Sequence, residues 1–327
     1  MTAVTTGPVD STVRALRPRI SVLVPAMDEA ENLPMFLELC AVSLSGESAG
    51  YEVIVIDDGS TDATHEVLGD LSARYPFLRS VRHRARRGIA DALRTGYLAA
   101  KGDILVFYPA DLQFKPVDIP RLVAPILAGD ADMVTGFKEG VYEKAFVSKI
   151  YNGLSRALFN VPVRDLNNVK AYRREIMDDQ PVRPDWHRYM IVLAHAKGYT
   201  VKEIPVPLYP RNAGKSKFGL SRIPIGVLDM LAVWFELRFG QKPLLAFGTL
   251  GASLFALGVL AGITALAVLL FTGVGLRSVW TIVQTCLLLG SIFFATGLLG
   301  EQIAVTRAEQ RELRRLIDEV QQDRRAR

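Results

Sequence analysis

Two adjacent carboxylates, Asp57 and Asp58, are the first residues in the chain whose setting suggests chemistry. They follow an apolar, β-branched run at 51–56, which predicts a buried strand, and they precede Gly59, which predicts a turn. In an open α/β sheet, ligands bind outside the carboxyl ends of the strands. Carboxylates at such a position suit ribose hydroxyls, base N–H groups or a metal ion. The alternative interpretation is a solvated turn.

A second acidic position follows the apolar run 103–108, where Asp111 and Gln113 are separated by one residue. A carboxylate and an amide offer two oxygen ligands. This suits Mg²⁺ or Mn²⁺, because such ions keep several waters and share ligands with substrate phosphates. A metal-bound diphosphate is a good leaving group, since its developing charge is neutralised. The alternative for Asp111 is a helix N-cap.

The elements that must position these residues alternate between strands and helices. This alternation predicts an α/β sandwich with a largely parallel sheet. From the apolar runs and the helical periodicity, strands are expected at 20–25, 51–56, 78–81, 103–108 and 131–135, with helices at 33–40, 65–71, 88–100 and 117–127. Further along, we expect a helix at 144–159, a strand leading into a helix at 171–177, a helix at 187–197 and a strand at 199–206.

The apolar excess of the chain is concentrated near its end. Hydrophobic residues make up 50% of the sequence, and the mean hydropathy is +0.20. Leu244–Phe271 and Val279–Leu299 contain no charged residue, and each exceeds the roughly 20 residues needed to cross a bilayer. They predict two transmembrane helices, with two buried core helices as the alternative. The stretch Leu220–Phe239 predicts an interfacial helix that is apolar on one side.

Basic residues beside the spans predict the orientation. The connection between the spans contains only Arg277, whereas Arg222, Arg238 and Lys242 precede them and seven arginines lie between Arg307 and Arg327. The positive-inside rule therefore places the large domain and both termini in the cytoplasm, at the inner (cytoplasmic) membrane. The net charge of +5 favours an anionic membrane surface rather than nucleic acid, because no basic face with interleaved aromatics is present.

These features give five predicted parts and no disulfide. The two cysteines, Cys40 and Cys286, fall in the cytoplasmic domain and in a span, so they are not expected to pair. The N-terminus lacks the apolar region of a signal peptide.

The five predicted parts of the chain are a flexible tail at 1–19, a cytoplasmic catalytic domain at 20–219, an interfacial amphipathic helix at 220–242, a transmembrane hairpin at 243–300 and a basic helical tail at 301–327.

The motifs together resemble a known family. The segments Val24-Pro25 to Asn32, Val55 to Asp62 and Ala110 to Gln113 resemble the family 2 glycosyltransferases, whose GT-A fold is a Rossmann-like mixed sheet between helices. Downstream segments are similar to the polyprenyl-phosphate glycosyltransferases, a group that includes dolichyl-phosphate mannose synthases and bacterial undecaprenyl-phosphate glucosyltransferases. Those segments begin at Asp165, Lys170, His187, Glu203 and Pro210, and the resemblance covers about 20–299.

The resemblance implies roles for individual residues. Asp111 and Gln113 would hold Mg²⁺ or Mn²⁺ and would act in catalysis with Arg211 and Lys215. The implied nucleotide-binding residues are Pro25, Asp28, Glu29, Asp57, Asp58, Arg87, Gly88 and Ala110. The implied acceptor-phosphate residues are Lys170, Arg173, Arg174, His187 and Ser216, with structural roles as the alternative for His187 and the two arginines.

Two positions depart from the family pattern. Pro109 stands where the family has the first acid of its Asp-x-Asp-x-Gln motif, which leaves metal dependence open. Met27-Asp28 stands where the family has an aromatic residue followed by Asn, which alters base stacking.

The expected reaction needs no dedicated general base. A lipid monophosphate has a second pKa of about 6, so it is mostly dianionic at neutral pH and can attack the anomeric carbon directly. The sequence therefore predicts inverting transfer of one sugar from a UDP- or GDP-sugar, such as UDP-glucose or GDP-mannose, to polyprenyl phosphate. The enzyme must mainly gather and align two anions.

Other functions fit the sequence less well. A P-loop hydrolase is excluded because Tyr209 stands where that motif needs a glycine, and a processive synthase would carry a Gln-x-x-Arg-Trp motif that is absent. A degenerate transferase acting as a membrane scaffold or binding protein remains the alternative, supported by Pro109. The tail 301–327 has apolar residues spaced for a short coiled coil, so a homo-oligomer is possible.

Overall fold

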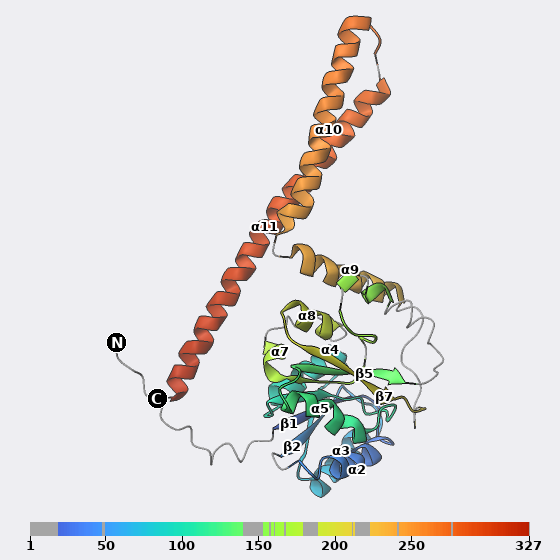
Figure 1. Ribbon diagram of the computed structural model, residues 1–327, viewed down its shortest axis with the longest axis vertical. Helices are drawn as coiled ribbons and strands as arrows, with labels where there is room; N and C mark the ends of the chain where they lie inside the picture. Colours follow the sequence, from blue (N-terminus) through green and yellow to red (C-terminus); the bar gives the residue numbers. More distant parts are fainter. Residues whose placement is uncertain are drawn as a thin grey trace. The chain divides into compact units, whose positions relative to one another are not determined.

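The computed structural model describes the chain in two compact units, Met1–Met230 and Leu231–Arg327. Figure 1 shows the helices and strands of both units. The residues described are 19–47, 50–139, 153–156, 158–159, 161–166, 168–178, 189–210, 212, 223–240, 242–275 and 277–326.

The first unit is built on one mixed sheet of seven strands, in the order β3-β2-β1-β4-β6-β5-β7. β6 is antiparallel to both of its neighbours, and every other pairing is parallel. The largely parallel sheet predicted from the sequence is therefore confirmed. The strands are β1 Ile20–Ala26, β2 Tyr51–Asp57, β3 Leu78–Arg82, β4 Ile104–Phe107, β5 Met133–Glu139, β6 Lys170–Arg173 and β7 Val201–Pro207.

Helices cover both faces of this sheet, because alternate residues of the central strands are apolar on each side. On one face, Val53 and Val55 pack in a core with Phe36 of α2. On the other face, α4 comes so close that a Cβ on Gly96 would lie 2.8 Å from Ile56 Cδ1. The helices of this unit are α2 Leu33–Ser43, α3 Thr64–Arg74, α4 Ile89–Ala99, the 3₁₀ turn η1 Pro116–Asp118, α5 Ile119–Leu127, α7 Arg174–Asp178 and α8 Met190–Ala196.

The strand order fixes where a ligand can bind. β1 has β2 on one side and β4 on the other, so the chain leaves the carboxyl ends of β1 and β4 toward opposite halves of the sheet. Such a switch in strand order opens a crevice, and α/β folds bind their ligands there. Both acidic segments predicted from the sequence follow strands in this part of the sheet.

The second unit contains two helices that are long and apolar enough to cross a membrane. They are α10 Pro243–Thr272 and the first part of α11 Arg277–Ala326. Only 11% and 17% of their apolar windows are buried, which disfavours the interpretation of two soluble core helices. α11 continues as one helix to Ala326, so the described residues of the predicted tail lie on the same helix as the second apolar stretch.

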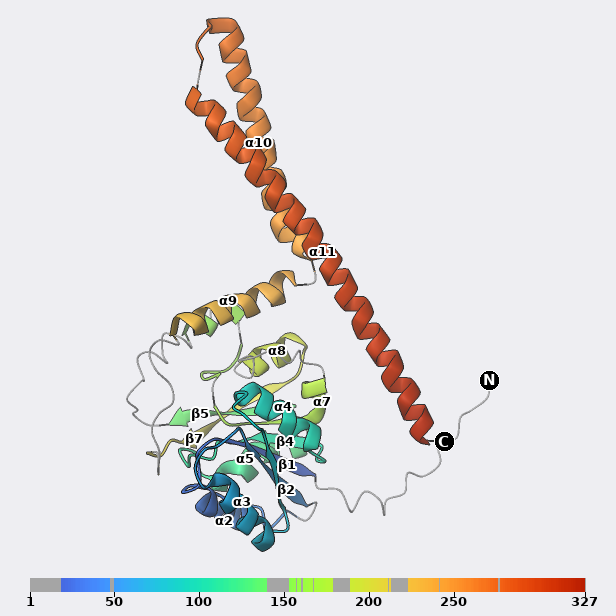
Figure 2. The same cartoon turned by 180° about the vertical axis from the view of Figure 1, so that it is seen from behind.

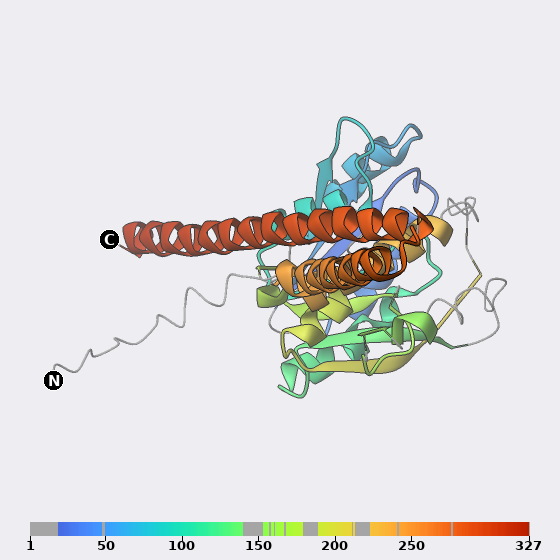
Figure 3. The same ribbon diagram turned by 90° about the horizontal axis from the view of Figure 1, so that it is seen from above.

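α10 and α11 run side by side as a hairpin (Figure 2 and Figure 3). Glycines allow the backbones to approach. A Cβ on Gly251 would lie 2.5 Å from the Phe294 nitrogen, and one on Gly290 would lie 2.7 Å from the Phe255 nitrogen. Small residues at helix contacts are typical of membrane spans, where van der Waals packing replaces the hydrophobic effect between helices.

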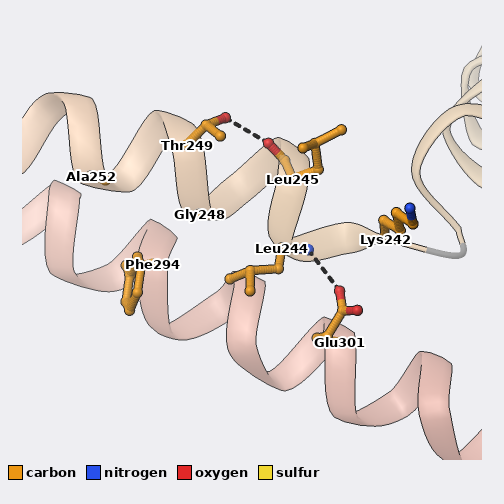
Figure 4. Close-up of a pocket in the computed structure, with 8 residues that line it drawn as sticks. All are labelled: Lys242, Leu244, Leu245, Gly248, Thr249, Ala252, Phe294 and Glu301. Atoms are coloured by element: carbon orange, nitrogen blue, oxygen red, sulfur yellow. Dashed lines mark hydrogen bonds between the residues drawn. The ribbon is translucent and has the colours of Figure 1, made fainter.

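A groove of about 460 Å³ lies on this hairpin near the start of α10 (Figure 4). Glu301 accepts a hydrogen bond from the Leu244 nitrogen at 3.3 Å, which satisfies one of the open N–H groups in the first turn of α10. The lining is apolar except at Lys242, Thr249 and Glu301.

The helix before the hairpin differs from its prediction. α9 spans Ile223–Phe239. Met230 and Val233 are buried, while Leu228 and Leu231 are exposed. Apolar side chains therefore lie on more than one side of α9, and the single apolar side expected from the sequence is not found. The physical reason is that apolar residues occupy most positions of this helix, so they cannot all lie on one side.

Candidate active site

The loop that follows β1 is held to the turn that follows β2. Asp28 has a φ of 51°, a left-handed conformation that is uncommon outside glycine. Its nitrogen donates to Ser60 Oγ at 2.9 Å, and its Oδ1 accepts from the Thr61 nitrogen at 2.8 Å. The Glu29 nitrogen donates to Thr64 Oγ1 at 2.9 Å. The nucleotide-binding segment predicted from the sequence is therefore a single hydrogen-bonded surface made from two strand ends.

The two adjacent acids after β2 have different partners. Asp57 Oδ1 accepts from the Ser60 nitrogen at 2.8 Å, and its Oδ2 lies 3.3 Å from Arg82 Nε. The carboxylate is buried and closes the turn by bonding to the residue three positions later. Asp57 thus shapes the turn from within the protein.

Asp58 binds the loop that follows β3. Its Oδ1 accepts from the Arg87 nitrogen and lies 2.8 Å from His83 Nδ1, while its Oδ2 accepts from the Gly88 nitrogen at 2.8 Å. These three contacts to one buried carboxylate firmly connect the turn after β2 to the loop after β3. His83 was not predicted as a site residue. It stands just beyond the carboxyl end of β3, and that position could have identified it.

The loop held by Asp58 packs directly on Gly59. Gly59 has a φ of 74°, and a Cβ there would lie 2.6 Å from the Arg86 nitrogen. Arg84, Arg86 and Arg87 are exposed on this loop. The loop leads into α4, whose first N–H groups add a partial positive charge. This corner of the molecule is consequently suited to an anion.

The turn after β4 contains the predicted metal ligands. Leu112 has a φ of 57°, so Asp28 and Leu112 are non-glycine residues in the left-handed region, one after each of the two strands that flank the switch point. The Gln113 nitrogen donates to Asp111 Oδ1 at 3.2 Å, which folds the carboxylate back over the turn.

Buried Tyr108 supports this turn. Burial raises its pKa well above the ordinary value, so the phenol stays protonated. Its hydroxyl donates to the Lys115 carbonyl at 2.7 Å and so joins the end of β4 to the far side of the turn.

A segment far along the chain returns to the same edge. The Tyr209 nitrogen donates to the Gln113 carbonyl at 2.9 Å, and Asn212 Nδ2 donates to Asn32 Oδ1 at 3.0 Å. Asn32 in turn donates to Glu29 Oε2 at 2.7 Å. Tyr209 is thus joined to the turn after β4, and Asn212 is joined to the loop after β1, so both sides of the switch point are contacted.

Lys170 and the two arginines after it lie at opposite edges of the sheet. Pairing of β6 with β4 places Lys170 opposite Phe107, at the carboxyl edge, and Arg173 opposite Ile104, at the amino edge. Arg173 contacts the Asp132 carboxylate at 3.2 Å, and Arg174 donates to backbone carbonyls including that of Ala100. Arg173 and Arg174 thus bond to neighbouring protein groups at the edge of the sheet opposite Lys170.

Most of the predicted site converges. The residues placed at the carboxyl edge of the sheet are Pro25, Asp28, Glu29, Asp57, Asp58, Arg87, Gly88, Ala110, Asp111, Gln113 and Lys170. The predicted helix at 144–159 is only partly described. His187, Arg211, Lys215 and Ser216 lie outside the described residues.

The donor set at Asp111 limits what kind of cation could bind. Within the described parts of the chain, no three His, Cys, Asp or Glu side chains come together as a metal site. One carboxylate and one amide, Asp111 and Gln113, fit a hard cation that takes its remaining ligands from water and from the substrate diphosphate. They do not fit a cation held by protein ligands alone.

Comparisons with known proteins show the family to which the chain belongs. Residues 21–179 match the model of the family described as Glycosyl transferase family 2. The chain is 30% identical over 305 residues to dodecaprenyl-phosphate galacturonate synthase of Rhizobium johnstonii, covering 88% of each chain. It is 27% identical to undecaprenyl-phosphate 4-deoxy-4-formamido-L-arabinose transferase of Pseudomonas fluorescens, covering 87% of this chain and 84% of that one.

Solved structures share the fold. Glucosyl-3-phosphoglycerate synthase from Mycobacterium tuberculosis, in complex with Mn²⁺, UDP and phosphoglyceric acid, is 22% identical with a TM-score of 0.55 and covers 69% of this chain and 80% of that one. Its complex with Mg²⁺ and UDP has a TM-score of 0.54 at 21% identity, covering 71% and 84%. The chain belongs to glycosyltransferase family 2, with the GT-A fold, and its relatives are polyprenyl-phosphate sugar transferases.

Proposed function

We propose that this glycosyltransferase moves one sugar from a nucleotide-sugar donor to a polyprenyl phosphate, with inversion at the anomeric carbon, at the cytoplasmic face of a membrane. One structural observation carries the proposal. The loops after β1 and β4, which flank the switch point, are both joined to the Tyr209–Asn212 segment. A donor bound at this point would have the Asp111 turn beside its diphosphate and a basic segment beside its acceptor.

The donor side follows from the two acidic strand ends. The surface formed by Asp28, Glu29 and the turn after β2 would bind the base and ribose, because carboxylates and backbone groups suit N–H and hydroxyl donors. The relatives transfer galacturonate and 4-deoxy-4-formamido-L-arabinose. Nucleotide derivatives of these two sugars are therefore the first donors to test, beside UDP-glucose and GDP-mannose.

On the acceptor side, an oxygen of the dianionic lipid phosphate attacks the anomeric carbon. The new C–O bond forms as the bond to the donor diphosphate breaks, and the nucleoside diphosphate leaves with the electron pair. The residues proposed to hold the acceptor phosphate are Lys170, His187, Arg211, Lys215 and Ser216. Arg211 can grip phosphate oxygens with two parallel hydrogen bonds, whereas a lysine acts as a point charge.

Asp111 and Gln113 would hold Mg²⁺ or Mn²⁺ together with the donor diphosphate. When bound, the cation would neutralise the charge that develops on the leaving group. Pro109 removes one carboxylate relative to the family pattern, so we expect the cation to bind tightly only when the donor is present.

The test is a donor panel with the purified full chain in nanodiscs. Wild-type protein, polyprenyl phosphate and Mg²⁺ or Mn²⁺ are incubated with each radiolabelled nucleotide sugar, and lipid-bound label is measured. We expect one donor to give product and chelator to abolish it.

Two other outcomes separate the alternatives. Product that is insensitive to chelator would refute the metal role while leaving the transferase intact. No labelled lipid from any donor would refute the proposed function and favour the membrane scaffold that Pro109 suggests.

A further inference from the structure

A buried polar chain connects the end of β2 to helix α4 through His83. His83 Nδ1 lies 2.8 Å from Asp58 Oδ1, and its Nε2 lies 2.9 Å from Thr95 Oγ1. His83 and Asp58 are only 5% and 6% exposed. A carboxylate has only acceptor positions, so the ring nitrogen facing Asp58 carries the hydrogen. Both ring nitrogens are used, and the imidazole has one orientation.

The partners of Asp58 show what this chain fixes. Besides His83, Asp58 accepts hydrogen bonds from the Arg87 and Gly88 nitrogens, each at 2.8 Å. The same loop contacts Gly59 too closely for any side chain there. The loop Arg84–Gly88 is consequently held from two directions, by a carboxylate and by a bare backbone surface.

The loop Arg84–Gly88 carries three arginines. Its side chains at Arg84, Arg86 and Arg87 are exposed, and within the described residues no ion pair holds them. Three guanidinium groups at the start of α4 create a positive corner beside the acidic turn at Asp57 and Asp58. A nucleotide, with its diphosphate charge and its base and ribose hydrogen-bonding groups, matches that combination.

We propose that His83 is a positioning residue for the nucleotide-sugar donor. By holding the Asp58 carboxylate between α4 and the Arg84–Gly88 loop, it sets where the arginines of that loop bind the donor. This inference rests on the proposed function. It adds His83 and Thr95 to the site and gives Asp58 an indirect role, acting through the loop.

The test compares variants that break the chain at different points. His83→Phe keeps the volume but removes both hydrogen bonds, and His83→Asn can still donate to Asp58. We expect His83→Phe to raise the donor KM about tenfold, which corresponds to losing one charged hydrogen bond. The acceptor KM and kcat should remain within about twofold, because the β4 turn is untouched. His83→Asn should recover most of the donor affinity.

The matched control lies at the opposite edge of the same sheet. Ser21 is also buried and donates to Glu52 Oε1 at 2.7 Å, near the amino end of β1. Ser21→Ala should lower the thermal midpoint to a similar degree but leave the donor KM unchanged. If His83→Phe behaves like Ser21→Ala, with lower stability and an unchanged donor KM, His83 is merely structural and the inference is overturned.

Calorimetry with UDP and GDP on the full chain in nanodiscs, with Mg²⁺ present, gives a second readout. The nucleotide that wild type binds should bind His83→Phe about tenfold more weakly. If His83→Phe does not fold, Thr95→Val replaces it, because it removes the partner of His83 Nε2 while keeping a side chain of similar size. A donor affinity of Thr95→Val equal to that of wild type would then overturn the inference. If wild type makes product while neither His83→Phe nor Thr95→Val weakens donor binding, this inference alone is refuted. A wild type that makes no product and binds neither nucleotide refutes the proposed function as well.

Discussion

Asp111 is the side chain on which the proposed chemistry depends most directly. It follows the strand that flanks the switch point, and it is the carboxylate that remains where Pro109 has replaced the other acid. In the proposed site, Asp111 supplies the carboxylate that would hold the cation, with Gln113 as the second ligand. A single substitution at Asp111 therefore tests the proposed chemistry.

Asp111→Asn should lower kcat about 10³-fold, because one electrostatic contact to the developing charge is lost. Initial rates at saturating donor and acceptor measure this. Asp70→Asn, an exposed carboxylate on α3, is the control and should keep the wild-type rate. A fully active Asp111→Asn enzyme would remove Asp111 from the site.

Gly59 lies at a position where a side chain would clash with the backbone of the next loop. Gly59→Ala should destabilise the protein by more than about 1 kcal/mol, because the residue has positive φ and its Cβ would meet the backbone of Arg86. Gly69→Ala should instead stabilise by about 0.5 to 1 kcal/mol, since Gly69 lies inside α3 and its Cβ would meet nothing within 4 Å. Thermal midpoints of the two variants should move in opposite directions. Equal shifts would contradict the described contact.

Some residue roles could be predicted from the sequence and some could not. The strand ends that bear Asp57, Asp58 and Asp111 follow from apolar runs that stop at acids. The partners of Asp58 could not be predicted, because His83 reaches it only after β3 pairs beside β2. The opposite placement of Lys170 and Arg173 likewise depends on the antiparallel pairing of β6, which local periodicity does not encode.

At the scale of elements, β7 contains a half-buried carboxylate whose ionisation affects stability. Burial raises the pKa of Glu203, and the N–H groups of Arg164 and Asp165 oppose this by donating to it at 2.7 and 3.1 Å. A carboxyl with a raised folded pKa binds its proton more tightly in the folded state. Its contribution is therefore fully present below its ordinary pKa and is lost as pH rises through the folded pKa.

Glu203→Gln should accordingly gain stability relative to wild type as pH rises through that window, because the amide keeps an acceptor oxygen and has no charge to desolvate. Thermal midpoints measured from about pH 4 to about pH 7 test this. A pH-independent difference for Glu203→Gln would contradict the role of burial.

The hairpin gives a prediction about elements that pack through their backbones. Gly290→Leu should force α10 and α11 apart and lower the thermal midpoint in nanodiscs, because a Cβ added at this position would lie 2.7 Å from the Phe255 nitrogen. Ser291→Leu, one residue along and exposed, should leave the midpoint near that of wild type. Equal midpoints for both variants would mean that the glycine contact does not stabilise the hairpin.

At the scale of the whole molecule, an α/β unit that we propose binds two anions is joined in one chain to two helices long and apolar enough to cross a membrane. Length and uncharged composition were enough to predict the two long apolar helices, and strand-helix alternation was enough to predict the sheet. The single apolar side predicted for α9 was wrong because apolar residues occupy most of its positions and therefore lie on more than one side of the helix. The combination of an α/β unit with two apolar helices in one chain fits an enzyme that uses a water-soluble donor and a lipid acceptor.

The central claim is that sugar is transferred to a lipid phosphate that keeps its single phosphate. Mass spectrometry of the lipid product, with analysis of the released nucleotide, tests it most directly. The account predicts a sugar joined to the polyprenol through one phosphate and release of a nucleoside diphosphate. A sugar joined through two phosphates with release of a nucleoside monophosphate would contradict it, as would a lipid that acquires no sugar from any donor.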